Sequence, residues 1–137
     1  MTSSDPSIVE RAETPVRYVE VADELSQIRL AWPALEEAVG SLKGRRFLAV
    51  FDPVQGWYRA CVQVQADATP SERELPGAVI PGGRFVRVRL RGEPPAVYDE
   101  IAPAYELLES SYDRDDHRPS VEHYRRLDEI DVLMPVK

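Results

Sequence analysis

Three alternating residues near the C-terminus, Ser120, Glu122 and Tyr124, have types and spacing that suit a chemical site. Within a strand, side chains two positions apart project from the same face, so these three would lie together. A carboxyl group beside a phenol, enclosed by apolar neighbours, would have a raised pKa and would suit proton transfer or the binding of a cation. The alternative is that Glu122 is a solvated charge that pairs with Arg125 or Arg126.

Aromatic residues make up only 8% of the chain, so their positions matter for any apolar binding surface. A carboxylate among aromatic rings attracts a delocalised cation through its charge and through the ring quadrupoles together. Aromatic side chains at strand spacing belong to the core more often than to a ligand site. Five of them are nevertheless candidates for lining a pocket: Tyr18, Phe51, Trp57, Phe85 and Tyr105.

The common signatures of metal, cofactor and nucleophile chemistry are missing from the sequence. It has no Gly-x-Ser-x-Gly elbow, phosphate loop or dinucleotide fingerprint. His117, His123 and Cys61 lack the spacing of metal ligands. Cys61, between Ala60 and Val62, is expected to be a half-buried filler and not a nucleophile. We therefore expect no metal and no cofactor.

Arg87, Arg89 and Arg91 alternate along one face of a predicted strand. Charged side chains in such a row commonly prevent the edge of a sheet from pairing with another chain. The simplest interpretation is therefore a charged edge strand.

The elements that must position these residues follow the order strand, strand, helix, strand, strand, and this order occurs twice. Alternation predicts the strands, and apolar spacings of three and four predict the helices. The first set has strands over residues 7–13, 16–22, 47–51 and 57–64, and a helix over 28–42 with Ser26 as its N-cap. The second set has strands over 78–80, 84–90, 120–124 and 129–136, and a helix over 94–111. Residues 65–76 are polar, contain prolines and are expected to form a linker.

Both predicted helices share an internal pattern. A Pro-Ala pair begins at Pro33 in one and at Pro103 in the other, and Glu36 and Glu106 follow in register. Proline inside a helix removes a hydrogen bond, so each helix should kink or restart. The shared order and pattern favour an α+β fold of two duplicated strand-helix-strand-strand units, with an antiparallel sheet, two main helices and a pocket between the repeats.

Length and charge limit the classes of function. The 137 residues suit a single domain, and the net charge of −7 argues against a nucleic-acid binder. No apolar run approaches the roughly 18 residues of a membrane span. The first residues lack the basic start and apolar stretch of a secretory signal. One cysteine cannot form an internal disulfide, so the reducing cytoplasm is the expected location.

The sequence resembles the GyrI-like domain family, which includes the effector-binding domains of BmrR and of AraC-type regulators such as Rob. The resemblance covers nearly the whole chain and is strongest over residues 80–136. It rests on Ile80-Pro81-Gly82-Gly83-Arg84-Phe85, Leu90-Arg91-Gly92, Pro119-Ser120-Val121-Glu122-His123-Tyr124 and the closing strand. It implies one domain over residues 1–137, with repeat one over about 7–65, a linker over 66–76 and repeat two over about 77–136.

The resemblance also implies roles for Glu122 and Tyr124. In GyrI-like domains the acidic residue of a Glu-x-Tyr motif lies in a pocket and meets cationic or polar ligands. Because no DNA-binding module precedes the first predicted strand, the implied function is stand-alone binding of hydrophobic, aromatic or cationic small molecules such as drugs and toxins.

Two alternatives stay open. Some GyrI-like proteins hydrolyse the cyclopropane ring of DNA-alkylating natural products, in which case Glu122 would position or deprotonate water while Tyr124 polarises a carbonyl. The founding family member inhibits DNA gyrase, so a protein partner is the second alternative, although the acidic residues here are spread along the chain.

Overall fold

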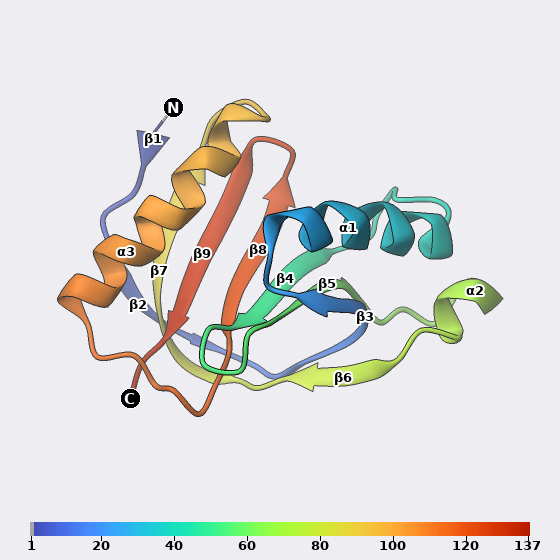
Figure 1. The fold of residues 1–137 in the computed structure, drawn as a ribbon, viewed down its shortest axis with the longest axis horizontal. Helices are drawn as coiled ribbons and strands as arrows, with labels where there is room; N and C mark the ends of the chain where they lie inside the picture. The colour runs from blue at the N-terminus through green and yellow to red at the C-terminus, as the bar shows by residue number, and fades with distance from the viewer. Residues whose placement is uncertain (1) are drawn as a thin grey trace.

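The order strand, strand, helix, strand, strand occurs twice in the structure, a computed structural model that describes residues 2–137 (Figure 1). The first set is β2 (Ser7–Arg11), β3 (Thr14–Ala22), α1 (Leu25–Val39), β4 (Phe47–Asp52) and β5 (Trp57–Gln63). The second set is β6 (Gly77–Ile80), β7 (Gly83–Arg91), α3 (Ile101–Ser111), β8 (Ser120–Arg126) and β9 (Glu129–Pro135). A 3₁₀ turn, η1 (Ala96–Glu100), leads into α3, a short β1 (Thr2–Ser3) precedes the first set, and α2 (Pro70–Arg73) joins the two sets. The α+β class and the repeated order are confirmed.

The strands form one antiparallel sheet in the order β1-β7-β9-β8-β4-β5-β3-β6, with β2 also paired to β7. The two repeats meet at the centre of this sheet, where β4 pairs with β8 and Ala49 lies opposite Glu122. Helices α1 and α3 cover the same face, α1 over the first repeat and α3 over the second (Figure 1). Glu122 therefore lies at the junction of the two repeats.

Apolar side chains fill both faces of the sheet. On the helix face, Leu35 of α1 and Leu108 of α3 each centre one apolar cluster, and Phe51 and Tyr124 contact both clusters. On the opposite face a third cluster includes Leu48, Cys61, Phe85, Val121 and Leu133. Because successive strand residues alternate between faces, these two sets interleave along β4, β5 and β8.

The helix boundaries differ from the predicted ones for local reasons. Helix α1 begins at Leu25 after Glu24, so Ser26 lies inside it and is not its N-cap. It ends at Val39 because Gly40 adopts a φ of 80°, which favours glycine. Pro103 lies in the first turn of α3, where its missing N–H has no partner within the helix, so the second helix restarts there as expected.

The predicted linker contains the short helix α2 and is tied to the first repeat. Thr69 caps α2 by accepting a hydrogen bond from the Glu72 backbone at 3.2 Å. Its hydroxyl also donates to the Ala38 carbonyl at 2.8 Å. Glu72 is fully buried and accepts from Arg45 Nη2 at 2.7 Å. Glu72, one of the polar residues on which the predicted linker rests, is therefore half of a buried ion pair.

Candidate ligand site between the repeats

Glu122 is enclosed where the two repeats join. Its side chain projects from β8 onto the helix face, and the residue is only 6% exposed. The Tyr124 hydroxyl donates a hydrogen bond to Glu122 Oε1 at 2.6 Å, so the two residues share a face as predicted. Arg125 and Arg126 are directed instead at the carboxylate of Glu129. The alternative of a solvated Glu122 paired with these arginines is therefore wrong.

Aromatic side chains from both repeats surround this carboxyl group. Trp32 of α1 packs edge-on against Tyr124, with 5.3 Å between ring centroids, and donates from Nε1 to the Tyr58 hydroxyl at 2.9 Å. On the side of the second repeat, Phe51 packs edge-on against Tyr105 at 4.9 Å. The aromatic side chains near Glu122 thus come from four elements: α1, β4, β5 and α3.

The site carries negative charge, and no ion pair within residues 2–137 neutralises it. The pKa of Glu122 is raised to about 7: burial raises it most, the hydrogen bond from Tyr124 lowers it, and the nearby charge of Asp23 adds to the rise. Burial also raises the pKa of Asp23. Among the residues described, none of the ion pairs includes Glu122. Near neutral pH this carboxyl group is therefore partly ionised without a cationic partner.

The structure places two of the five predicted aromatic residues on the Glu122 face of the sheet: Phe51 lies two positions along β4 from the Ala49 that pairs with Glu122, and Tyr105 packs edge-on against Phe51. It does not bring Tyr18, Trp57 and Phe85 there, because these three pack in the cluster on the opposite face of the sheet.

The rings of Tyr18 and Trp57 already hold a cation of the protein itself. The Arg59 guanidinium lies 4.2 Å from each of the two ring centroids. Its Nε also donates to Glu20 Oε1 at 2.8 Å. Phe85 is fully enclosed, with the Arg118 guanidinium 5.0 Å from its ring centroid. Each of these three rings therefore already contacts an arginine of the same chain.

Three residues of the site were not predicted: Trp32, Tyr58 and Asp23. Trp32 lies on the apolar stripe of the first helix, and Tyr58 lies on the helix-facing side of β5. Such positions are typical of core residues, because the sequence shows which residues face a helix but not which of them reach the junction. Asp23 lies in the break between β3 and α1, where the sequence carries no sign of a second acidic group near Glu122.

Cys61 and the histidines do not add a reactive centre. Cys61 is fully buried, where half burial was expected, and burial raises the pKa of its thiol to about 12. Burial and neighbouring arginines, Arg11 foremost, lower the pKa of His123 to about 4. Within residues 2–137 no three His, Cys, Asp or Glu side chains are grouped to hold a metal ion, and no helix is long and apolar enough to cross a membrane.

Solved structures of low sequence identity share this fold. An integron cassette protein from the mobile metagenome of Vibrio cholerae has a TM-score of 0.77 at 15% identity, covering 98% of this chain and 97% of that one. SAV2435, solved bound to tetraphenylphosphonium, has a TM-score of 0.68 at 13% identity, covering 98% and 94%. A hydrolase from Listeria innocua has a TM-score of 0.54 at 12% identity, covering 96% and 91%. No family model and no curated protein matches the sequence.

These likenesses concern the fold. They confirm the duplicated α+β fold that the sequence resemblance implied, over nearly the full length of the chain. At this level of identity the site chemistry has to be argued from the residues themselves.

Proposed function

We propose that this protein binds hydrophobic cations at the junction of its two repeats, with Glu122 as their counter-ion. The observation that carries this proposal is a buried carboxyl group with a pKa of about 7, ringed by aromatic side chains and free of any internal ion pair among the described residues. A lipophilic cation would supply the missing charge and bury its apolar surface against the rings. The tetraphenylphosphonium bound by SAV2435 is a ligand of this class.

Ligand access requires some of these side chains to move. Two hollows in the described residues, of about 450 and 230 Å³, are lined by arginines of β7 and their neighbours, and Glu122 lines neither. At the repeat junction Trp32 and Tyr124 are half-buried and pack against each other, and the Tyr124 hydroxyl donates to Glu122. We infer that these two side chains separate when a ligand binds. The Tyr124 hydroxyl would then exchange its bond to Glu122 for a contact with the ligand or water.

Trp32 provides a direct reporter of this event. The chain has two tryptophans, so Trp57→Phe leaves Trp32 as the only one, and Trp57 lies on the opposite face of the sheet. Titration of this variant with tetraphenylphosphonium should give a saturable change in Trp32 fluorescence. The added substitution Glu122→Gln should weaken binding at least tenfold at pH 8.5, whereas Glu37→Gln on the exposed face of α1 should leave it unchanged.

Two results would contradict the proposal. If tetraphenylphosphonium does not bind saturably, this class of ligand is wrong. If it binds with equal affinity to the Glu122→Gln and Glu37→Gln variants, the carboxyl group is not its counter-ion.

A hydrolase acting at the same site is the second candidate. The short Tyr124–Glu122 hydrogen bond and the pKa of about 7 suit Glu122 to take a proton from water near neutral pH. The activity expected from the sequence resemblance is addition of water to the strained cyclopropane ring of a DNA-alkylating natural product, with Tyr124 polarising a carbonyl. Mass spectrometry of such a compound should show a hydrated product that disappears with Glu122→Gln. Turnover that survives this substitution would exclude these roles.

A further inference from the structure

A row of arginines occupies the sheet face opposite the helices. Val88 and Leu90 of β7 pack against α3, so Arg87, Arg89 and Arg91, which alternate with them, project from the other face. Strand β7 pairs with β9 on one side and with β1 and β2 on the other. It is therefore not an edge strand, and the interpretation of these arginines as protection of a sheet edge is wrong.

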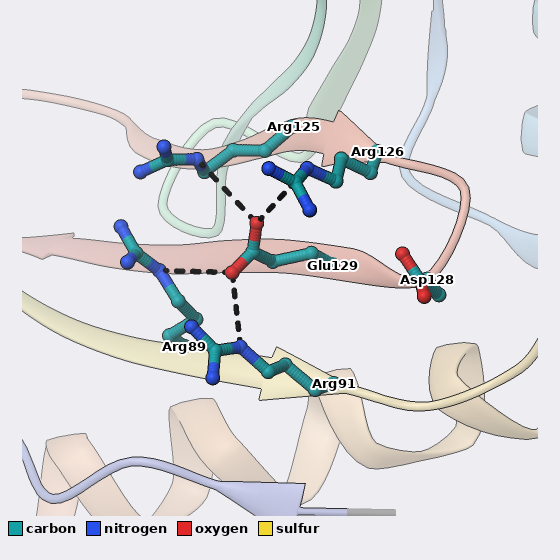
Figure 2. Close-up of a pocket in the computed structure, with 6 residues that line it drawn as sticks. All are labelled: Arg89, Arg91, Arg125, Arg126, Asp128 and Glu129. Atoms are coloured by element: carbon teal, nitrogen blue, oxygen red, sulfur yellow. Dashed lines mark hydrogen bonds and ion pairs between the residues drawn. The ribbon is translucent and has the colours of Figure 1, made fainter.

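Strand β8 adds two further arginines to this face through a local irregularity. The pairing of β8 with β9 shifts between Tyr124 and Arg126, as in a β-bulge. In a regular strand Arg125 and Arg126 would project to opposite faces, but here both are directed at Glu129 (Figure 2). The carboxylates of Glu129 and Asp131 on β9 thus lie between two arginine-bearing strands.

These arginines outnumber the Glu129 and Asp131 carboxylates that lie between them, and Arg89 already donates to Asp131 from Nε at 2.7 Å and from Nη2 at 3.2 Å. Four arginines surround Glu129, but only Arg91 Nε, at 3.0 Å, makes a hydrogen bond to it. The nitrogens of the other three are 3.7, 3.8 and 3.9 Å from its oxygens, beyond hydrogen-bond distance. The Nε atom of Arg87 is buried and has no hydrogen-bond partner among the described residues.

Two adjoining hollows open beside these arginines. The larger, of about 450 Å³, is lined by the four arginines around Glu129 together with Asp128 and Glu129 (Figure 2). The smaller, of about 230 Å³, shares Arg89 and Arg91 and is otherwise lined by Arg87 and by Thr2, Ser3 and Ser4. Guanidinium forks next to hydroxyl groups are the chemistry that recognises phosphate oxygens.

We propose that this arginine face, formed by Arg87, Arg89, Arg91, Arg125 and Arg126, binds a small polyanion bearing more than one phosphate group. Its five arginines exceed the neighbouring Asp128, Glu129 and Asp131 by two charges, which leaves about −9 for the rest of the chain. An extended polyanion such as DNA would meet that negative charge, whereas a compact ligand fits within the two hollows. The positive charge of this face also acts on the neighbouring Arg11. Burial is the largest cause of the lowered pKa of Arg11; the charge of Asp131 opposes it, and the charges of Arg125 and Arg87 lower the pKa further.

The experiment uses inorganic pyrophosphate as the probe and isothermal titration calorimetry as the readout. The double variant Arg91→Gln/Arg126→Gln removes two exposed arginines of the face, so it should fold normally, which circular dichroism checks. The matched control is Arg29→Gln/Arg84→Gln, two exposed arginines outside the face. We expect wild type and control to bind alike, the double variant to bind at least tenfold more weakly, and the wild-type affinity to fall with added salt.

Absence of saturable pyrophosphate binding to the wild type, or equal binding by both double variants, would overturn the proposal. Binding of duplex DNA without binding of pyrophosphate would overturn the assignment of a compact ligand. The two sites are also separable, because Glu122→Gln should leave pyrophosphate binding intact. Conversely, the Arg91→Gln/Arg126→Gln variant should still bind tetraphenylphosphonium.

Discussion

Replacing Glu122 with glutamine should change how the stability of the fold depends on pH. A carboxyl group whose pKa is higher in the folded protein than in the unfolded chain binds its proton more tightly in the folded state. Its contribution to stability is therefore present at low pH and is lost as the pH rises from the unfolded value of 4.5 to the folded value of about 7. Glutamine keeps the acceptor oxygen for Tyr124 but cannot ionise, so it removes this loss.

The size of the effect follows from the same pKa values. A rise in pKa from 4.5 to about 7 corresponds to roughly 3 kcal/mol, since one pKa unit is worth about 1.4 kcal/mol. Most of this difference, roughly 2 to 3 kcal/mol, falls between pH 5 and pH 8. Urea unfolding followed by circular dichroism at these two pH values gives the free energy of unfolding of each protein. Relative to the wild type, Glu122→Gln should gain roughly 2 to 3 kcal/mol of unfolding free energy in going from pH 5 to pH 8.

The exposed Glu37→Gln variant is the control and should show no such gain. If Glu122→Gln differs from the wild type by the same amount at both pH values, the effect is one of packing and the carboxyl group does not carry the raised pKa. That result would refute the electrostatic description of the site.

Three further predictions concern ligand affinity, the Tyr124 hydroxyl and the backbone. If only ionised Glu122 holds a cation, tetraphenylphosphonium should bind roughly 30-fold more tightly at pH 8.5 than at pH 5.5, while neutral triphenylphosphine oxide should show no pH dependence in the same fluorescence titration. Tyr124→Phe removes a hydrogen bond that lowers the pKa of Glu122, so the pH dependence of unfolding should extend to higher pH; an unchanged profile would contradict the 2.6 Å bond. Gly82→Ala should lower the melting temperature more than Gly44→Ala. A Cβ atom at position 82 would lie 2.7 Å from backbone atoms of Arg11 and Glu13, whereas a Cβ atom at position 44 would meet no atom within 4 Å and would only be strained by the φ of 74°. Equal melting temperatures would contradict the close approach at Gly82.

The sequence predicts the strands and the pairing of Glu122 with Tyr124 well, because both depend on a two-residue alternation that the chain displays locally. It does not predict that Trp32, 92 residues earlier, packs on Tyr124, because that contact depends on which repeat lies beside which. Trp57 and Tyr18 illustrate the same limit: their aromatic character suggested a ligand surface, but Arg59 lies against both rings.

The arginine face was misinterpreted for a related reason. Whether a strand is at an edge depends on partners distant in the sequence, here β1 and β2, which pair with β7. The shift in register beside Arg125 has no signal in the sequence. A gyrase partner, the second alternative to small-molecule binding, depends on contacts outside this chain and stays untested.

The central claim is that ionised Glu122 is the counter-ion of a bound cation, and proton release on binding tests it most directly. With a pKa of about 7, Glu122 is about half protonated at pH 7, and a cation beside it must drive the proton off. Calorimetric titration of tetraphenylphosphonium at pH 7, in buffers of different ionisation enthalpy, counts the protons released. We predict about half a proton per ligand for the wild type and none for Glu122→Gln. Tight binding to the wild type with no proton release would contradict the claim.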